Sequence, residues 1–294
     1  MSILEALALL VAGFGAGTIN AIVGSGTLIT FPTLLFLGYP PLVANVSNNI
    51  GLVAGGIGSI RGYRDELAGH GPTIRRLLPA SIVGSATGAL LLLVLPEDAF
   101  VAIVPVLIAL ALVLVVSGPS LNRRFAAAHA RRAVDARDAA LAADPTAEPT
   151  DAATVDPASA PTTAAARAEG IAPGIVGTIT LAGVLLAGVY GGYFGAAQGV
   201  LLIGVMSVLM ADPLQRINGF KNVLGTAVNA VAAIIFVIVA TDKIDWAVVG
   251  VIAVGALGGG YAGARIGRQL PPTALRGLIV VIGTIAILKI VFFD

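Results

Sequence analysis

The second half of this chain repeats the first at an offset of 173 residues. The matched positions carry glycine, proline and asparagine: Gly26 with Gly199, Pro40 with Pro213, Asn45 with Asn218, and Asn49 with Asn222. Long apolar runs surround these positions in both halves. We therefore predict a duplicated bundle of membrane helices, an architecture typical of transporters.

The apolar runs are too extensive for a water-soluble core. Hydrophobic residues make up 57% of the chain, charged residues make up 11%, and the mean hydropathy is +0.97. We therefore expect an all-α, multi-pass protein of the cytoplasmic membrane. Weakly charged stretches close to the roughly 20 residues that span a bilayer run through 3–23, 75–95, 99–117, 172–194, 220–240, 246–264 and 277–293, and a shorter Gly-rich stretch covers 45–60.

The positions of arginine and lysine predict the orientation of each half, because these residues accumulate in cytoplasmic loops. In the first half, the loop 61–76 is basic and the turn 96–98 is acidic. In the second half the bias is reversed, because the loop 241–245 carries two aspartates and the turn 265–276 carries three arginines. Opposite bias in equivalent loops predicts two inverted-topology repeats. Both chain ends then lie outside the cell.

Two apolar segments are too short to cross the membrane alone. Residues 26–38 and 199–211 would each form a helix of about 20 Å, whereas the hydrocarbon core is about 30 Å thick. We expect each segment to form a broken-helix hairpin with the segment before it, entering and leaving by one face. Each half is then a hairpin plus three full spans, which gives about 8 to 10 membrane segments in total.

The segment between the halves differs in composition. We predict a first transmembrane repeat at 1–118, a cytoplasmic linker at 119–170 and a second transmembrane repeat at 171–294. The linker is rich in alanine, proline, threonine and aspartate, and it has too few apolar residues to pack. A tether between the halves is the simplest interpretation, and a regulatory segment is the alternative.

Glycine-rich breaks precede both short helices, at 24–27 and at Gln198 with Gly199. Lipid cannot form hydrogen bonds with the free N–H and C=O groups of a broken helix. Such breaks therefore face other parts of the protein or a water-filled cavity. A helix that restarts there points free N–H groups and the positive end of its dipole into the cavity, which favours an anion. Close helix packing is the alternative explanation for small residues, and we assign Gly88 and Gly259 to packing.

A polar segment follows each hairpin. Its asparagines recur one helical turn apart on a common face, and in the second half a lysine lies between them. Amides and an ammonium group can both donate hydrogen bonds to an oxyanion. Two alternatives remain open: helix N-caps for the first asparagine of each segment, and a lysine side chain that extends to the cytoplasmic interface. The candidate binding residues are Asn45, Asn48 and Asn49 in the first half, and Asn218, Lys221 and Asn222 in the second.

Other functional groups are missing from the predicted spans. No aspartate or glutamate lies in their interior, whereas proton-driven carriers commonly use a buried carboxylate or histidine. Passive or potential-driven movement of an anion is therefore favoured. The absence of cysteine excludes thiolate metal sites. We expect no cofactor, no metal and no nucleic-acid partner.

The residues of the first hairpin resemble the sulfite exporter family of membrane permeases, the TauE/SafE group. The likeness rests on Gly24-Ser25-Gly26, Pro32, Pro40 and the stretch 45–49, which read VGSGTLITFPTLLFLGYPPLVANVSNN. The second half repeats this order as AAQGVLLIGVMSVLMADPLQRINGFKN. The resemblance covers nearly everything except the linker.

This resemblance implies a carrier of small sulfur-containing or organic anions, such as sulfite, sulfonates, sulfoacetate or thiosulfate. The chain departs from the glycine-rich family pattern at Ser25, Thr27 and Gln198, whose side chains would adjust which ligand binds. The candidate site therefore consists of both breaks and the two polar segments.

Our leading hypothesis is a secondary transporter, a permease or exporter that works by alternating access and is not an enzyme. One alternative is a membrane-embedded enzyme acting on lipid pyrophosphate, which would need clustered acids, a histidine nucleophile or a metal cage. Another is a non-transporting membrane scaffold whose linker recruits a cytosolic partner.

Overall fold

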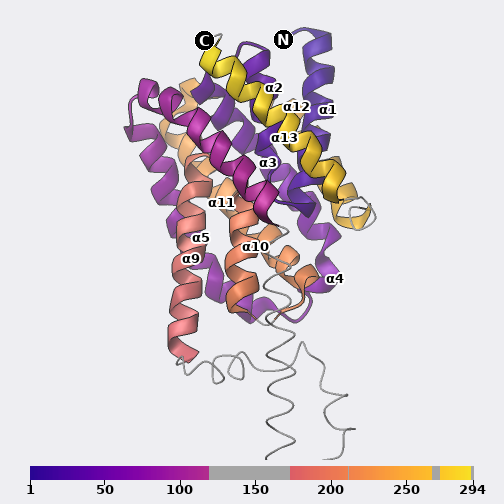
Figure 1. Cartoon of the computed structure of the whole chain (residues 1–294), viewed down its shortest axis with the longest axis vertical. Coiled ribbons are helices and arrows are strands. Elements are labelled where there is room, and N and C mark those ends of the chain that lie inside the picture. The colour runs from indigo at the N-terminus through magenta and orange to yellow at the C-terminus, as the bar shows by residue number, and fades with distance from the viewer. Residues whose placement is uncertain (119–172, 211, 267–271, 293–294) are drawn as a thin grey trace, which may run out of the picture.

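The computed structural model describes residues 1–118, 173–210, 212–266 and 272–292, and these residues form helices without any strand. The predicted linker and part of the turn 265–276 lie outside the described residues. The first half contains α1 (Ile3–Ile22), α2 (Thr27–Phe36), α3 (Pro41–Gly62), α4 (Arg64–Leu67), α5 (Gly71–Val94) and a helix at Glu97–Gly118. The second half contains α9 (Pro173–Tyr193), α10 (Gln198–Leu209), α11 (Leu214–Val239), η1 (Thr241–Lys243), α12 (Trp246–Ile266) and α13 (Pro272–Phe292) (Figure 1).

The helices have the properties of membrane spans. In the described part of the chain, five are long and apolar enough to cross a bilayer: α1, α5, Glu97–Gly118, α11 and α12. Large apolar side chains such as Leu186, Ile238 and Val254 are exposed on the outer surface, where hydrocarbon rather than water is their natural solvent. The prediction of an all-α, multi-pass membrane protein is confirmed.

Both helices are interrupted as predicted, but the second interruption lies at 194–197, and the predicted Gln198 and Gly199 form the first turn of α10. Gly24 and Gly195 have φ angles of +85° and +79° and directly follow the C-terminal turns of α1 and α9. Glycine is favoured there because a side chain makes a positive φ costly. The two breaks correspond at an offset of 171 residues rather than 173, since α10 has 12 residues and α2 has 10.

Glycines also bring helices of opposite halves into close contact, in two equivalent pairs. Helix α1 packs on α12, and α9 packs on α5. A Cβ on Gly259 would lie 2.0 Å from the carbonyl oxygen of Phe14, and one on Gly88 would lie 2.0 Å from that of Val189. Backbones this close exclude any larger residue. The assignment of Gly88 and Gly259 to packing is confirmed.

The hairpins enter from opposite ends of the molecule. Helices α1 and α9 begin at opposite ends, and both chain termini lie at one end (Figure 1). Burial raises the pKa of Tyr39, which follows α2, and the negative charges of Asp245 and Glu5 raise it further. Phe220, near the start of α11, contacts His70 at the other end, with ring centroids 5.9 Å apart. This arrangement agrees with the inverted repeat, which stays a prediction.

Candidate functional site

The two breaks meet in the middle of the bundle. The N–H of Gly199 donates a hydrogen bond of 3.0 Å to the carbonyl oxygen of Gly24. A Cβ on either glycine would lie 2.4 Å from the Cα of the other. The two backbones touch at this point, so only glycine fits on both sides. Residues separated by more than half of the chain therefore form one site.

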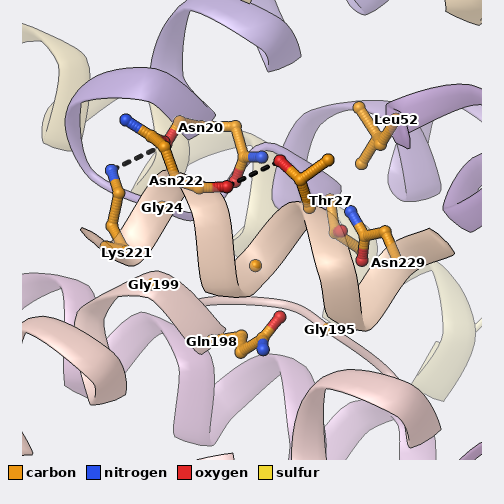
Figure 2. Close-up of a pocket in the computed structure, with 12 residues that line it drawn as sticks. Asn20, Gly24, Thr27, Leu52, Gly195, Gln198, Gly199, Lys221, Asn222 and Asn229 are labelled. Carbon is orange, nitrogen blue, oxygen red and sulfur yellow. Dashed lines mark hydrogen bonds between the residues drawn. The ribbon is translucent and has the colours of Figure 1, made fainter. Parts of the chain in front are cut away.

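Lys221 and Asn222 of α11 cap the broken end of α1. The Lys221 ammonium donates to the carbonyl oxygen of Asn20 at 2.9 Å (Figure 2). It also donates to Ala21 at 2.8 Å, and the Asn222 amide donates to Ala21 at 3.2 Å. The last carbonyls of a helix lack partners within the helix and carry its negative dipole end, so a cation is favourable there.

The position of Lys221 decides between the two interpretations of this lysine. Its side chain is only 2% exposed, and among the described residues it is the only buried charged side chain. The alternative in which Lys221 extends to the cytoplasmic interface is therefore wrong. A buried charge inside a membrane protein is costly and typically marks a functional site.

Asn45 of α3 caps the other break. Its amide donates a hydrogen bond of 3.0 Å to the carbonyl oxygen of Tyr193, the last residue of α9. The N-cap positions of α3 and α11 are Pro40 and Pro213, and Asn45 lies inside its helix. Asn218 likewise lies inside α11. The N-cap alternative for these asparagines is therefore wrong.

A small polar cavity lies where the breaks meet (Figure 2). Its volume is about 20 Å³, which is room for about one water molecule. In this conformation the walls are closed too tightly for a polyatomic anion. The lining residues are Asn20, Gly24, Thr27, Leu52, Gly195, Gln198, Gly199, Lys221, Asn222, Gly225, Thr226 and Asn229.

Half of the residues predicted from the sequence line this cavity. They come from both breaks and from α11: Gly24, Thr27, Gln198, Gly199, Lys221 and Asn222. The others lie outside the lining: Ser25, Gly26, Asn45, Asn48, Asn49 and Asn218.

Two of these outer residues contact the lining directly. The Asn48 amide donates to the Thr27 hydroxyl at 3.5 Å, and the Asn49 amide donates to Asn229 at 3.4 Å. They position lining residues rather than facing the cavity.

Sequence reasoning missed several polar residues of the lining. Thr226 and Asn229 follow Asn222 by one and two helical turns, so they extend the same face of α11. That periodicity was available in the sequence. Asn20 is a single amide near the end of an apolar helix, and nothing in its local sequence distinguishes it from a packing residue.

The hydrogen-bond donors of the cavity differ from those expected. The N–H groups of Gln198 and Gly199 bind the carbonyl oxygens of Gly195 and Gly24, so neither is free for an anion in this conformation. The side-chain nitrogen Nε2 of Gln198 has no hydrogen-bond partner among the described residues, and Gln198 is only 5% exposed. A buried donor without a partner is costly, so this amide is a candidate to bind water or a ligand.

Gly191 provides the space for this amide. A Cβ at Gly191 would lie 2.3 Å from the Cδ and 2.6 Å from the Nε2 of Gln198. On the other side of the cavity, Lys221 uses two of its three N–H groups on the α1 carbonyls. The third N–H of Lys221 therefore remains to bind a ligand, and a half-turn of the Gln198 amide would bring its nitrogen to the cavity side.

Comparisons with known proteins agree with this geometry. A family model described as Sulfite exporter TauE/SafE matches residues 9–290. The chain is also 38% identical over 109 residues to a protein of a Sinorhizobium species described as "Probable membrane transporter protein ORF9". That match covers 35% of this chain and 40% of the relative. No solved structure matches the chain.

Proposed function

Since this chain belongs to the sulfite exporter TauE/SafE family of membrane transporters, we propose that it is a secondary transporter for a small sulfur-containing or organic anion, such as sulfite or a sulfonate. The observation that carries the proposal is the buried Lys221 ammonium, which lies in a polar cavity between two broken-helix hairpins. Broken helices and a buried charge at the interface of two repeats are typical of secondary transport sites.

Recognition of the anion follows from the donors of the cavity. The ammonium of Lys221 supplies the charge, and the Nε2 group of Gln198 supplies a neutral hydrogen bond. The N-terminus of α10 also begins at this point, so its dipole adds positive potential. A hydrogen bond in which one partner is charged is stronger than one between neutral groups. Lys221 would therefore contribute most to the affinity for the anion.

Alternating access would require the two breaks to separate. The backbones of Gly24 and Gly199 touch, and the cavity of about 20 Å³ is smaller than any substrate of the proposed class. An anion therefore enters only when one hairpin moves relative to the other. If the halves are inverted repeats, the same movement in the other hairpin opens the opposite side.

The family assignment removes the alternative of an enzyme acting on lipid pyrophosphate, because the family is one of membrane transporters. A scaffold that moves no solute is the remaining alternative. Flux measurements distinguish the two, since a scaffold produces no anion movement in a purified system.

The test is uptake by the purified full-length chain in proteoliposomes. Sulfite, methanesulfonate, acetate and the cation choline are compared in wild type, Lys221→Gln and Gln198→Ala. We expect anion uptake without choline uptake, and a fall of about tenfold or more in Lys221→Gln. Gln198→Ala removes only a group without a partner, so it keeps the fold and tests the site independently. Absence of anion uptake in wild type, or unchanged uptake in both variants, contradicts the proposal.

A further inference from the structure

The cavity contains one positive charge. Its carbonyl oxygens disfavour a second negative charge on a bound ligand. Among the described lining residues, Lys221 is the only charged or titratable side chain. Its ammonium already touches the carbonyl oxygens of Asn20 and Ala21, the negative end of α1. The other polar side chains of the lining are neutral amides and hydroxyls.

We infer that the site selects its substrate by charge and carries monovalent anions in preference to divalent anions of the same size and shape. This inference rests on the proposed function. A monovalent anion beside Lys221 gives a neutral pair, whereas a divalent anion leaves one unpaired negative charge inside the membrane protein. One unpaired charge inside a membrane protein should lower the occupancy of the site by the divalent anion about 50-fold or more.

The hydrogen bonds of Lys221 favour the same selection. Because two of its three N–H groups hold the carbonyls of α1, a single N–H is left for the ligand. A second negative charge would find no further ammonium N–H in the cavity, because the other two hold the carbonyls of α1. A monovalent anion needs only the third N–H of Lys221 and the amide of Gln198.

Sulfite is a useful case because it loses its second proton near neutral pH. The monovalent form, hydrogensulfite, would be the transported species, so sulfite uptake should rise as the pH falls. A sulfonate is monovalent across this range. Its uptake therefore serves as the reference for the pH dependence of sulfite uptake.

The experiment compares methanesulfonate, methylphosphonate and sulfate in proteoliposomes at mildly acidic and mildly alkaline pH. Methylphosphonate has nearly the shape of methanesulfonate, but it gains a second negative charge as the pH rises, so the pair separates charge from size. We expect methylphosphonate uptake to fall by about tenfold relative to methanesulfonate uptake as the pH rises, and sulfate uptake to lie about 50-fold or more below methanesulfonate uptake.

Two results overturn the inference while leaving transport in place. One is sulfate uptake equal to that of methanesulfonate, and the other is the same pH dependence for methanesulfonate and methylphosphonate. Absence of uptake for every anion instead overturns the proposed function itself. A fluorescence or calorimetric titration of the detergent-solubilised chain with the same three anions checks that the selection occurs in binding.

Discussion

The two helix breaks have the same backbone design but different chemistry. At the first break, the charged Lys221 and the amide of Asn222 hold the last carbonyls of α1. At the second break, the neutral amide of Asn45 holds the last carbonyl of α9. The residue of the first half that matches Lys221 in the repeat is Asn48, whose amide contacts Thr27.

This comparison separates the features that the two halves share from those in which they differ. Glycines and helix ends agree between the halves because the backbones must meet at Gly24 and Gly199. The buried charge occurs at one break alone among the described residues. The two breaks are therefore similar in backbone geometry, whereas the proposed site is asymmetric: α11 would supply the charge and α10 the amide.

The largest expected effect comes from filling the contact between the breaks. In Gly199→Ala, the new Cβ would lie 2.4 Å from the Cα of Gly24 and 3.0 Å from the Cδ of Lys221. We expect a loss of about 3 kcal/mol or more in stability, measured by thermal unfolding in detergent, and no uptake.

Gly204→Ala is the matched control, because it lies in the same helix and its Cβ would meet nothing within 4 Å. We expect it to be neutral or slightly stabilising. Equal stability of Gly199→Ala and Gly204→Ala would show that the two breaks do not touch as described.

The second prediction concerns a variant in which one residue of the second half is replaced by its counterpart in the first half. Lys221→Asn introduces the residue that occurs at the matching position, Asn48. We expect anion uptake to fall about tenfold or more, and stability to fall by about 1 to 3 kcal/mol because the carbonyl of Asn20 loses its side-chain donor and that of Ala21 keeps only Asn222. Uptake measured alongside thermal unfolding separates the two effects. If a folded Lys221→Asn variant takes up the anion as fast as wild type, Lys221 does not bind the substrate.

The two capping asparagines offer a matched pair with opposite expectations for function. Asn222→Ala and Asn45→Ala each remove one hydrogen bond to a helix end, at 3.2 Å and 3.0 Å. Each should lower stability by about 1 to 2 kcal/mol. Only Asn222 lines the cavity, so only Asn222→Ala should also raise the KM for uptake. A higher KM in Asn45→Ala would extend the site to the second break.

The sequence predicted the spans and the breaks because both depend on local signals. Runs of apolar residues gave the helices to within a few residues, and glycines gave the ends of α1 and α9. Contacts between the halves depend on tertiary structure. The bonds from Lys221 to Asn20 and Ala21 join residues about 200 positions apart, and the local sequence around Lys221 does not specify them.

The asparagines show the same limit. Asn45 and Asn218 have an identical place in the repeat, but Asn45 caps α9 and the oxygen Oδ1 of Asn218 has no partner among the described residues. The repeat therefore predicted matching positions for the two asparagines, and it did not predict their different roles. The two additional residues of α10 explain part of the difference, since they shift the breaks relative to the polar segments.

A smaller effect is expected at Gln198. Because its Nε2 group has no partner among the described residues, Gln198→Ala should leave thermal stability unchanged or slightly higher. It should raise the KM for methanesulfonate by about threefold to tenfold, the value of one hydrogen bond to a charged ligand. A clear loss of stability with no change in KM would make Gln198 a packing residue.

The smallest effect is expected at an exposed lysine outside the cavity. Lys243 pairs with Glu97, and the hydrogen bond and charge of that carboxylate raise the pKa of Lys243. The stabilisation is present below the ordinary lysine pKa and is lost as the pH rises through the raised value. Exposed pairs contribute little, so uptake by Lys243→Gln should stay within about twofold of wild type. A larger loss would make this loop part of the transport cycle.

Substrate protection of single cysteines tests the central claim most directly, because the chain has no native cysteine. Thr27→Cys and Gln198→Cys place one thiol at the start of α2 and one at the start of α10. If both breaks form one anion site, methanesulfonate should slow the reaction of both thiols with a small thiol reagent, with the same concentration dependence. Protection of one thiol alone, or of neither, would contradict the account.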